Sequence, residues 1–168
     1  MTILRGATNC AAAAALIASP LFTAPALATP GFNFGPPSLV VNGHFGKVQV
    51  NTAGDKTDKW GMVLKTLDDT DIGSDRITIQ AGGFSGWHAH PAPVFVTVTQ
   101  GSIVWVNGSD PLCTPHPFSS GESFIEDAYV IHDVRNASSS ESAEYIAIRM
   151  NPTGVAFRLD RDEPNNCD

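Results

Sequence analysis

Short runs of alternating apolar and polar residues, each ended by a turn sequence, limit most strongly how this chain can fold. Arg76–Gln80 and Val94–Thr99 show the alternation best, and both are rich in β-branched residues. Gln100-Gly101 and Asn107-Gly108 are typical turn sequences between such runs. After the first 28 residues, no stretch of ten or more shows the period of an amphipathic helix. The pattern therefore predicts an all-β domain of eight or more short strands. A double-sheet jelly roll or barrel is expected, because it leaves few open edges.

The N-terminal segment 1–28 has the composition of a secretory signal peptide. Arg5 is its only charged residue, an apolar run over Cys10–Ile17 follows, and Ala26-Leu27-Ala28 places small residues where a signal peptidase cuts. Prolines interrupt the apolar stretch, which is therefore too short to span a membrane. We expect cleavage after Ala28, with a second possible cut after Ala26, and a secreted or periplasmic protein without a membrane span.

The rest of the chain divides into three predicted parts. Residues 29–45 begin with a Pro- and Gly-rich stretch and are expected to form an extended leader, residues 46–160 the barrel, and residues 161–168 a C-terminal tail. Cys113 and Cys167 remain after cleavage, and two cysteines in an exported protein fit one disulfide. Two free thiols are the alternative.

The charge balance restricts the partners. The sequence has 10 Lys+Arg against 17 Asp+Glu, a formal net charge of -7. Nucleic-acid binding needs a basic face, and docking on anionic lipid needs basic clusters. We therefore expect a small-molecule ligand as the partner, with a homodimer as a further possibility.

Three of the five histidines lie in apolar surroundings and are candidate metal ligands. His88 and His90 are two residues apart, a spacing that puts both imidazoles on one face of a strand. His132 ends another apolar run, Tyr129–His132. His44 and His116 have Gly- and Pro-rich neighbours and are predicted to lie in loops. Imidazole nitrogens commonly bind divalent metals.

The residues around these histidines resemble the two sequence motifs of the cupin family. Gly82, the His88-Ala89-His90 triplet and Gly101 fall at the offsets of the first motif. The second motif is matched by three residues, Gly121, His132 and Asn136. The resemblance implies a cupin barrel, a double-stranded β-helix, with His88, His90 and His132 as metal ligands.

Three positions depart from the family pattern. Val94 stands where the first motif has its metal-binding Glu, and Asp127 and Tyr129 stand where the second motif has Pro and Gly. The site therefore resembles the three-histidine subset of cupins, which hold iron or another divalent metal. Two alternatives stay open: the histidines line a metal-free pocket, or Glu126 or Asp127 supplies the missing anion.

The same resemblance leads to predictions for the pocket and the function. We expect four lining residues: Trp87, Val94, Val96 and Phe124. Glu126 is either an additional ligand or acid/base group, or an exposed turn carboxylate. Iron is the favoured metal, although zinc, copper and manganese also suit imidazole ligands. The predicted activity is dioxygenase-like, on a small apolar or aromatic substrate. A non-catalytic barrel that binds a metal or small ligand is the alternative, and an isomerase or lyase a third.

Overall fold

The computed structural model describes residues 29–52 and 60–167, and over these residues the chain forms strands and loops but no helix. The predicted signal peptide, residues 1–28, lies outside the described residues. The strands are β1 (Phe32–Phe34), β2 (Ser38–Phe45), β3 (Gln49–Asn51), β4 (Val63–Lys65), β5 (Thr70–Phe84), β6 (His88–Ala89), β7 (Val94–Gln100), β8 (Ser102–Asn107), β9 (Pro115–Ser119), β10 (Ser123–Glu126), β11 (His132–Asn136), β12 (Ala143–Pro152) and β13 (Leu159–Asp160).

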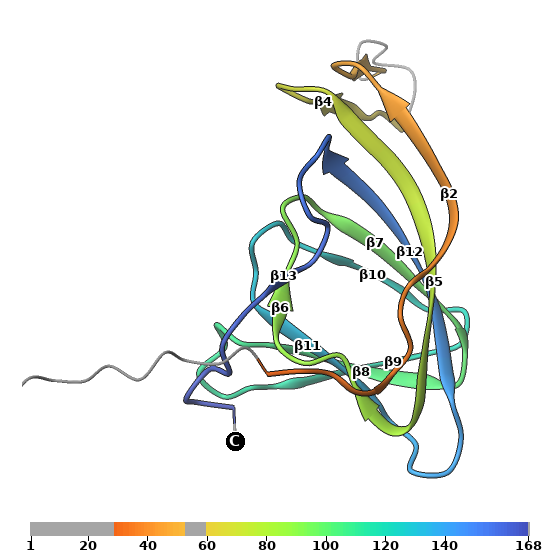
Figure 1. Ribbon diagram of the computed structural model, residues 1–168, viewed down its shortest axis with the longest axis vertical. Helices are drawn as coiled ribbons and strands as arrows, with labels where there is room; N and C mark the ends of the chain where they lie inside the picture. The colour runs from red at the N-terminus through yellow and green to blue at the C-terminus, as the bar shows by residue number, and fades with distance from the viewer. Residues whose placement is uncertain (1–28, 53–59, 168) are drawn as a thin grey trace, which may run out of the picture.

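One antiparallel sheet curls into a nearly closed barrel (Figure 1). Its strand order is β10-β7-β12-β5-β11-β6-β13, with β1 and β2 also paired to β5, and β8 paired to β11 and β9. The 15-residue strand β5 forms much of one wall, and β2 runs beside it (Figure 1). A separate hairpin, β3–β4, lies at the top of the view. The prediction of an all-β jelly-roll barrel is confirmed.

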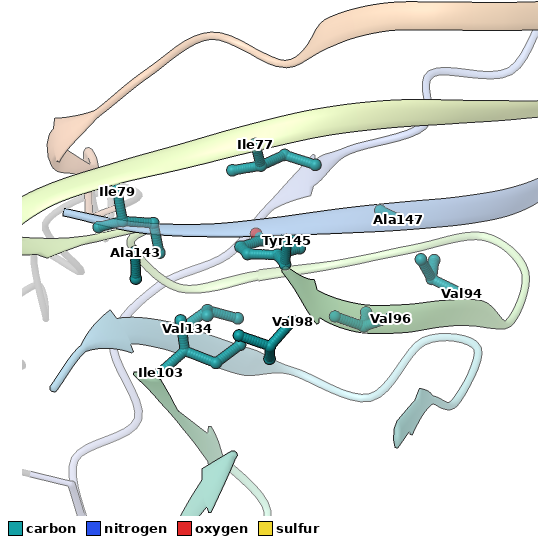
Figure 2. Close-up of a cluster of buried hydrophobic side chains, with 10 residues drawn as sticks. All are labelled: Ile77, Ile79, Val94, Val96, Val98, Ile103, Val134, Ala143, Tyr145 and Ala147. Carbon is teal, nitrogen blue, oxygen red and sulfur yellow. The ribbon is translucent and has the colours of Figure 1, made fainter. Parts of the chain in front are cut away.

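The barrel interior is filled by the apolar side of the alternating strands. β7 buries every second residue, and Figure 2 shows the three valines facing side chains of β5 and β12. The members of this cluster are Ile77, Ile79, Val94, Val96, Val98, Ile103, Val134, Ala143, Tyr145 and Ala147. Burial of one large aliphatic side chain contributes about 1.5–3 kcal/mol. The period-two pattern therefore sets which face of each strand points inward.

Part of the predicted leader belongs to the sheet. β1 and β2 pair with β5 over Phe32–Phe34 and Ser38–Phe45. His44 therefore lies in a strand, and the loop prediction for it is wrong. The loop prediction for His116 is also wrong, because it lies in β9. Among the described strands it pairs with β8 alone, and prolines such as Pro115 and Pro117 are tolerated at a sheet edge.

The predicted strand over Tyr129–His132 is replaced by a turn, and β11 begins only at His132. Tyr129 has a positive φ of 61° and donates its backbone N–H to the carbonyl of His90. This is the position where the second cupin motif has Gly. A left-handed conformation is strained for tyrosine, so the backbone here keeps the glycine geometry without the glycine.

The C-terminal segment folds back along the first histidine strand. β13 pairs with β6, and Asp160 lies opposite His88. The predicted disulfide between Cys113 and Cys167 is present. Cys167 packs against Trp87 in a second apolar cluster, so the end of the chain is tied down beside the histidines. No helix in the described ranges, residues 29–52 and 60–167, is long and apolar enough to cross a membrane.

Candidate metal centre

Three buried histidines converge in the barrel. His88 lies in β6, His90 follows it, and His132 begins β11 directly opposite His88. One nitrogen of each ring lies within 4.8 Å of the others. The exposed fractions are 5%, 4% and 0% for His88, His90 and His132. The predicted grouping of the three histidines is therefore confirmed, and they could hold one metal ion.

Each imidazole is oriented by a backbone carbonyl. The Nδ1 atoms of the three rings lie 2.8, 2.9 and 2.9 Å from the carbonyl oxygens of Gly86, Phe157 and Val130, in the order His88, His90, His132. A carbonyl oxygen only accepts, so each Nδ1 must carry the hydrogen. The neutral ring then keeps a lone pair on Nε2, the tautomer that a metal-binding histidine needs.

A carboxylate lies against these Nε2 atoms. Glu126 is the last residue of β10, and its side chain is buried. Its Oε2 lies 3.3 Å from Nε2 of His90, and its Oε1 lies 3.2 Å from Nε2 of His132. Burial alone would raise the pKa of Glu126, but the positive charge and the Nε2–H donors of His132 and His90 in their protonated form outweigh burial and lower that pKa well below its usual range. Glu126 is therefore a buried anion.

The two histidine pKa shifts follow from the same geometry. Burial lowers the pKa of His88 well below its ordinary value, and the neighbouring His132 adds to the effect. Burial also acts to lower the pKa of His132, but the carboxylate of Glu126 outweighs it and raises that pKa. A positive charge is favoured next to Glu126 and disfavoured at His88.

This donor set suits a metal cation. In the neutral rings, where the hydrogen is on Nδ1, the Nε2 lone pairs and the Glu126 oxygens are all acceptors that face one another. Among the described residues, the buried Nε2 of His132 makes no hydrogen bond, although a carboxylate oxygen lies near it. Two ligand atoms at ordinary bond lengths of about 2.1 Å from one ion lie about 3.0–3.4 Å apart. The separations of 3.2 and 3.3 Å match this range.

The family comparison agrees with this geometry. A protein-family model described as a cupin domain matches residues 75–149. This part of the chain is a cupin domain. It contains all three histidines, and Glu126 as well.

Solved structures from several organisms are similar to this chain. A cupin-like protein from Thermotoga maritima is 17% identical with a TM-score of 0.47, over 55% of this chain and 65% of that chain. An oxalate decarboxylase from Lactobacillus farciminis is 23% identical with a TM-score of 0.45, over 53% of this chain and 26% of that one. A cupin domain from Bordetella pertussis is 16% identical with a TM-score of 0.42, over 64% of this chain and 95% of that one. The alignment thus spans less than two thirds of the first two. No curated protein matches the sequence.

Within the cupin domain, strand register explains how Glu126 reaches the histidines. Val94 occupies the motif position of the missing Glu, and β10 pairs with β7 so that Glu126 lies directly opposite Val94. Residues directly opposite in an antiparallel pair point to the same face of the sheet. A carboxylate on β10 therefore projects from the same face as the missing one would.

A small cavity of about 60 Å³ adjoins two of the three histidines, His88 and His90. Its lining residues are Phe34, Pro37, Ile77, His88, His90, Glu126, Tyr145, Ala147, Phe157 and Arg158. None of the four predicted pocket residues is among them. Val94 and Val96 are core side chains, Phe124 stacks on Phe118, and Trp87 packs against Cys167.

The four residues predicted for the pocket therefore do not line this cavity. Trp87 directly precedes β6, and its side chain packs in the second apolar cluster with Cys167. The valines of β7 are covered by β12 and β5. Tyr145 could have been expected from the alternation Ala143-Tyr145-Ala147, whereas Phe157 and Arg158 carry no pattern in the sequence that links them to the histidines.

Proposed function

We propose that the protein is an exported, metal-dependent cupin enzyme with dioxygenase-like chemistry on a small substrate. Its metal is held by three histidines, His88, His90 and His132, with Glu126 as a fourth ligand. The observation that supports this most strongly is the buried convergence of acceptor atoms, with every Nδ1 bonded to a backbone carbonyl.

Iron is the favoured metal, and zinc, copper and manganese are the alternatives. A bound iron ion would supply open coordination positions for a substrate and O₂. Glu126 reduces the charge of a divalent ion and its ligands from +2 to +1, and the neutral histidines leave it unchanged. Burial of all four side chains keeps bulk water away from the ligand atoms.

Tyr145 adds a neutral hydrogen-bond donor to the cavity. Burial raises its pKa well above the ordinary value, so the phenol stays protonated at neutral pH. It can donate to an oxygen atom of a bound substrate but cannot serve as a base. The one carboxylate among the residues that line the cavity is that of Glu126.

A non-catalytic cupin that stores or senses a metal or small ligand is the second candidate. The small volume of the cavity favours it, as does the absence of any lining carboxylate besides Glu126. If Glu126 is a ligand, no free base remains among the described residues of the lining. The alternative predicts tight metal binding without turnover.

Oxygen uptake separates the two candidates. The iron-loaded protein is supplied with phenolic and dicarbonyl compounds, and O₂ consumption is followed with an electrode. We expect uptake by the wild type and by His116→Ala, because His116 is an exposed histidine of β9. His132→Ala should lose both iron and uptake. Iron-loaded protein that consumes no O₂ with any compound would favour the non-catalytic candidate.

Export is tested separately by the mass of the protein recovered outside the cytoplasm. A chain that begins at Thr29 is expected. The disulfide supports export, because such bonds persist in oxidising compartments. Full-length protein confined to the cytoplasm would contradict this part of the proposal.

A further inference from the structure

Arg158 is the cation nearest the metal cavity. It is the one Lys or Arg among the residues that line this cavity. It also lines an outer depression of about 360 Å³, together with Asp160. Phe34 and Pro37 line both spaces as well. Arg158 therefore borders both the outer depression and the cavity that His88 and His90 line.

The guanidinium of Arg158 is held by three hydrogen bonds. Its Nε donates to Oδ1 of Asp160 at 2.5 Å, and its Nη2 donates to the carbonyl oxygens of Ser85 and Gly86 at 2.9 and 3.5 Å. A guanidinium has five N–H groups, and the two on Nη1 make no bond within the described part of the chain. The side chain is thus fixed in place with two donors left for a ligand.

Tyr145 offers a further donor to the same cavity. Its side chain is 6% exposed, and its hydroxyl makes no hydrogen bond to residues 29–52 or 60–167. The hydroxyl is therefore free to donate to an acceptor atom on a ligand in the cavity.

The charges at the site add up to a positive value. A divalent ion contributes +2, Glu126 -1, Arg158 +1 and Asp160 -1, which leaves +1 in a protein whose formal net charge is -7. A carboxylate would neutralise this charge, and its two oxygens match the fork of a guanidinium. The cavity of about 60 Å³ admits only a few heavy atoms.

We propose that this pocket binds a small carboxylate, held by the Nη1 group of Arg158 and the hydroxyl of Tyr145 beside the metal. This inference rests on the proposed metal site. It narrows the substrate class from small molecules in general to those with a carboxylate group at the end that enters the cavity.

The test measures binding of acetate and of its neutral analogue acetamide to the metal-loaded protein by calorimetric titration. Metal content is determined first for each variant. The wild type should bind acetate at least tenfold more tightly than acetamide. Arg158→Gln should lose most of this preference, and Tyr145→Phe should weaken acetate binding about threefold to tenfold. Arg161→Gln is the matched control, because Arg161 lies on the same segment outside the cavity lining.

A purely structural role of Arg158 would weaken both probes alike and leave the preference for acetate unchanged, which would overturn the inference. An acetate affinity of Arg158→Gln within twofold of the wild-type affinity would also overturn the inference. If Arg158→Gln does not fold, Tyr145→Phe decides, and unchanged acetate binding in it overturns the inference. Wild-type protein without metal contradicts the proposed function instead. If the metal-free protein still binds acetate, and Arg158→Gln abolishes that binding, the proposed carboxylate site stands even though the proposed metal site does not.

Discussion

Replacing Glu126 with glutamine should weaken metal binding without destabilising the metal-free protein. The substitution keeps the size and shape of the side chain and removes its charge. The carboxylate oxygens lie 3.2 and 3.3 Å from the Nε2 atoms of His132 and His90, and the residue is 3% exposed, so water screens the charge little. Loss of one partner from a buried charge pair typically costs about 3–5 kcal/mol. We expect a fall in metal affinity on the order of 100-fold, about 3 kcal/mol.

The metal-free protein should respond differently. In the wild type, the carboxylate faces two nitrogen lone pairs, and only a proton can relieve the repulsion between acceptors. The side-chain amide introduced by Glu126→Gln would bring an N–H donor to one of the nitrogens. Once a proton on His132 relieves the repulsion in the wild type, the side chains of His132 and Glu126 form a buried ion pair, and replacing such a pair by well-packed neutral groups is often neutral or stabilising. The unfolding free energy of metal-free Glu126→Gln should therefore stay within about 1 kcal/mol of the wild type.

Chelator competition gives the metal affinity, and calorimetry gives the melting temperature of the metal-free and loaded forms. The stabilisation by saturating metal should shrink by about 3 kcal/mol in Glu126→Gln. Glu141→Gln, at an exposed position of the same cupin domain, should match the wild type in both measurements. Metal affinity within threefold of the wild type, combined with a large loss of metal-free stability, would show that Glu126 is a structural residue and refute the reasoning.

Three further predictions concern the tail, the strained turn and pH. Cys167→Ser opens a disulfide with a sequence separation of 54 and should lower the unfolding free energy by about 4 kcal/mol in denaturant titrations; a loss below about 1 kcal/mol would contradict this. Tyr129→Gly should raise the unfolding free energy by up to about 1 kcal/mol, because φ is 61° there; a lower melting temperature would refute it. Burial keeps the pKa of His88 low, so below about pH 6.5 the unfolded chain takes up a proton that the folded metal-free protein does not. Relative to His88→Gln, the stability of the metal-free wild type should therefore fall between pH 7 and 5, by up to about 1.4 kcal/mol per pH unit; equal pH profiles would contradict the assignment.

The fold class could be predicted because burial imposes a period of two on each strand. The valines of β7 and the isoleucines of β5 show that period in the sequence and in the structure. The extent of β5 could not be predicted, because Gly82-Gly83 has the composition of a turn. The strand nevertheless continues to Phe84. Glycine is needed at position 83 because a Cβ there would lie only 2.7 Å from the carbonyl oxygen of Asn33 in β1. A glycine inside a strand here marks close approach of another strand rather than a turn.

The three histidines could be found because the spacing of His88 and His90 is local and the motif offsets add His132. The position of Glu126 depends on the register of β10 against β7, a pairing between distant segments that the alternation of one strand does not specify. The lining of this cavity could not be predicted for the same reason. Arg158 reaches it because β13 pairs with β6, a contact across about 70 residues of sequence.

Elemental analysis of the mature protein, purified from its own compartment without chelator, tests the central claim most directly. The account predicts about one equivalent of a divalent metal per chain, iron first, and none in His132→Ala. One equivalent of zinc would keep the site but redirect the search toward non-redox chemistry. A wild-type protein that holds no metal, even after incubation with iron, manganese, copper and zinc, would contradict the account.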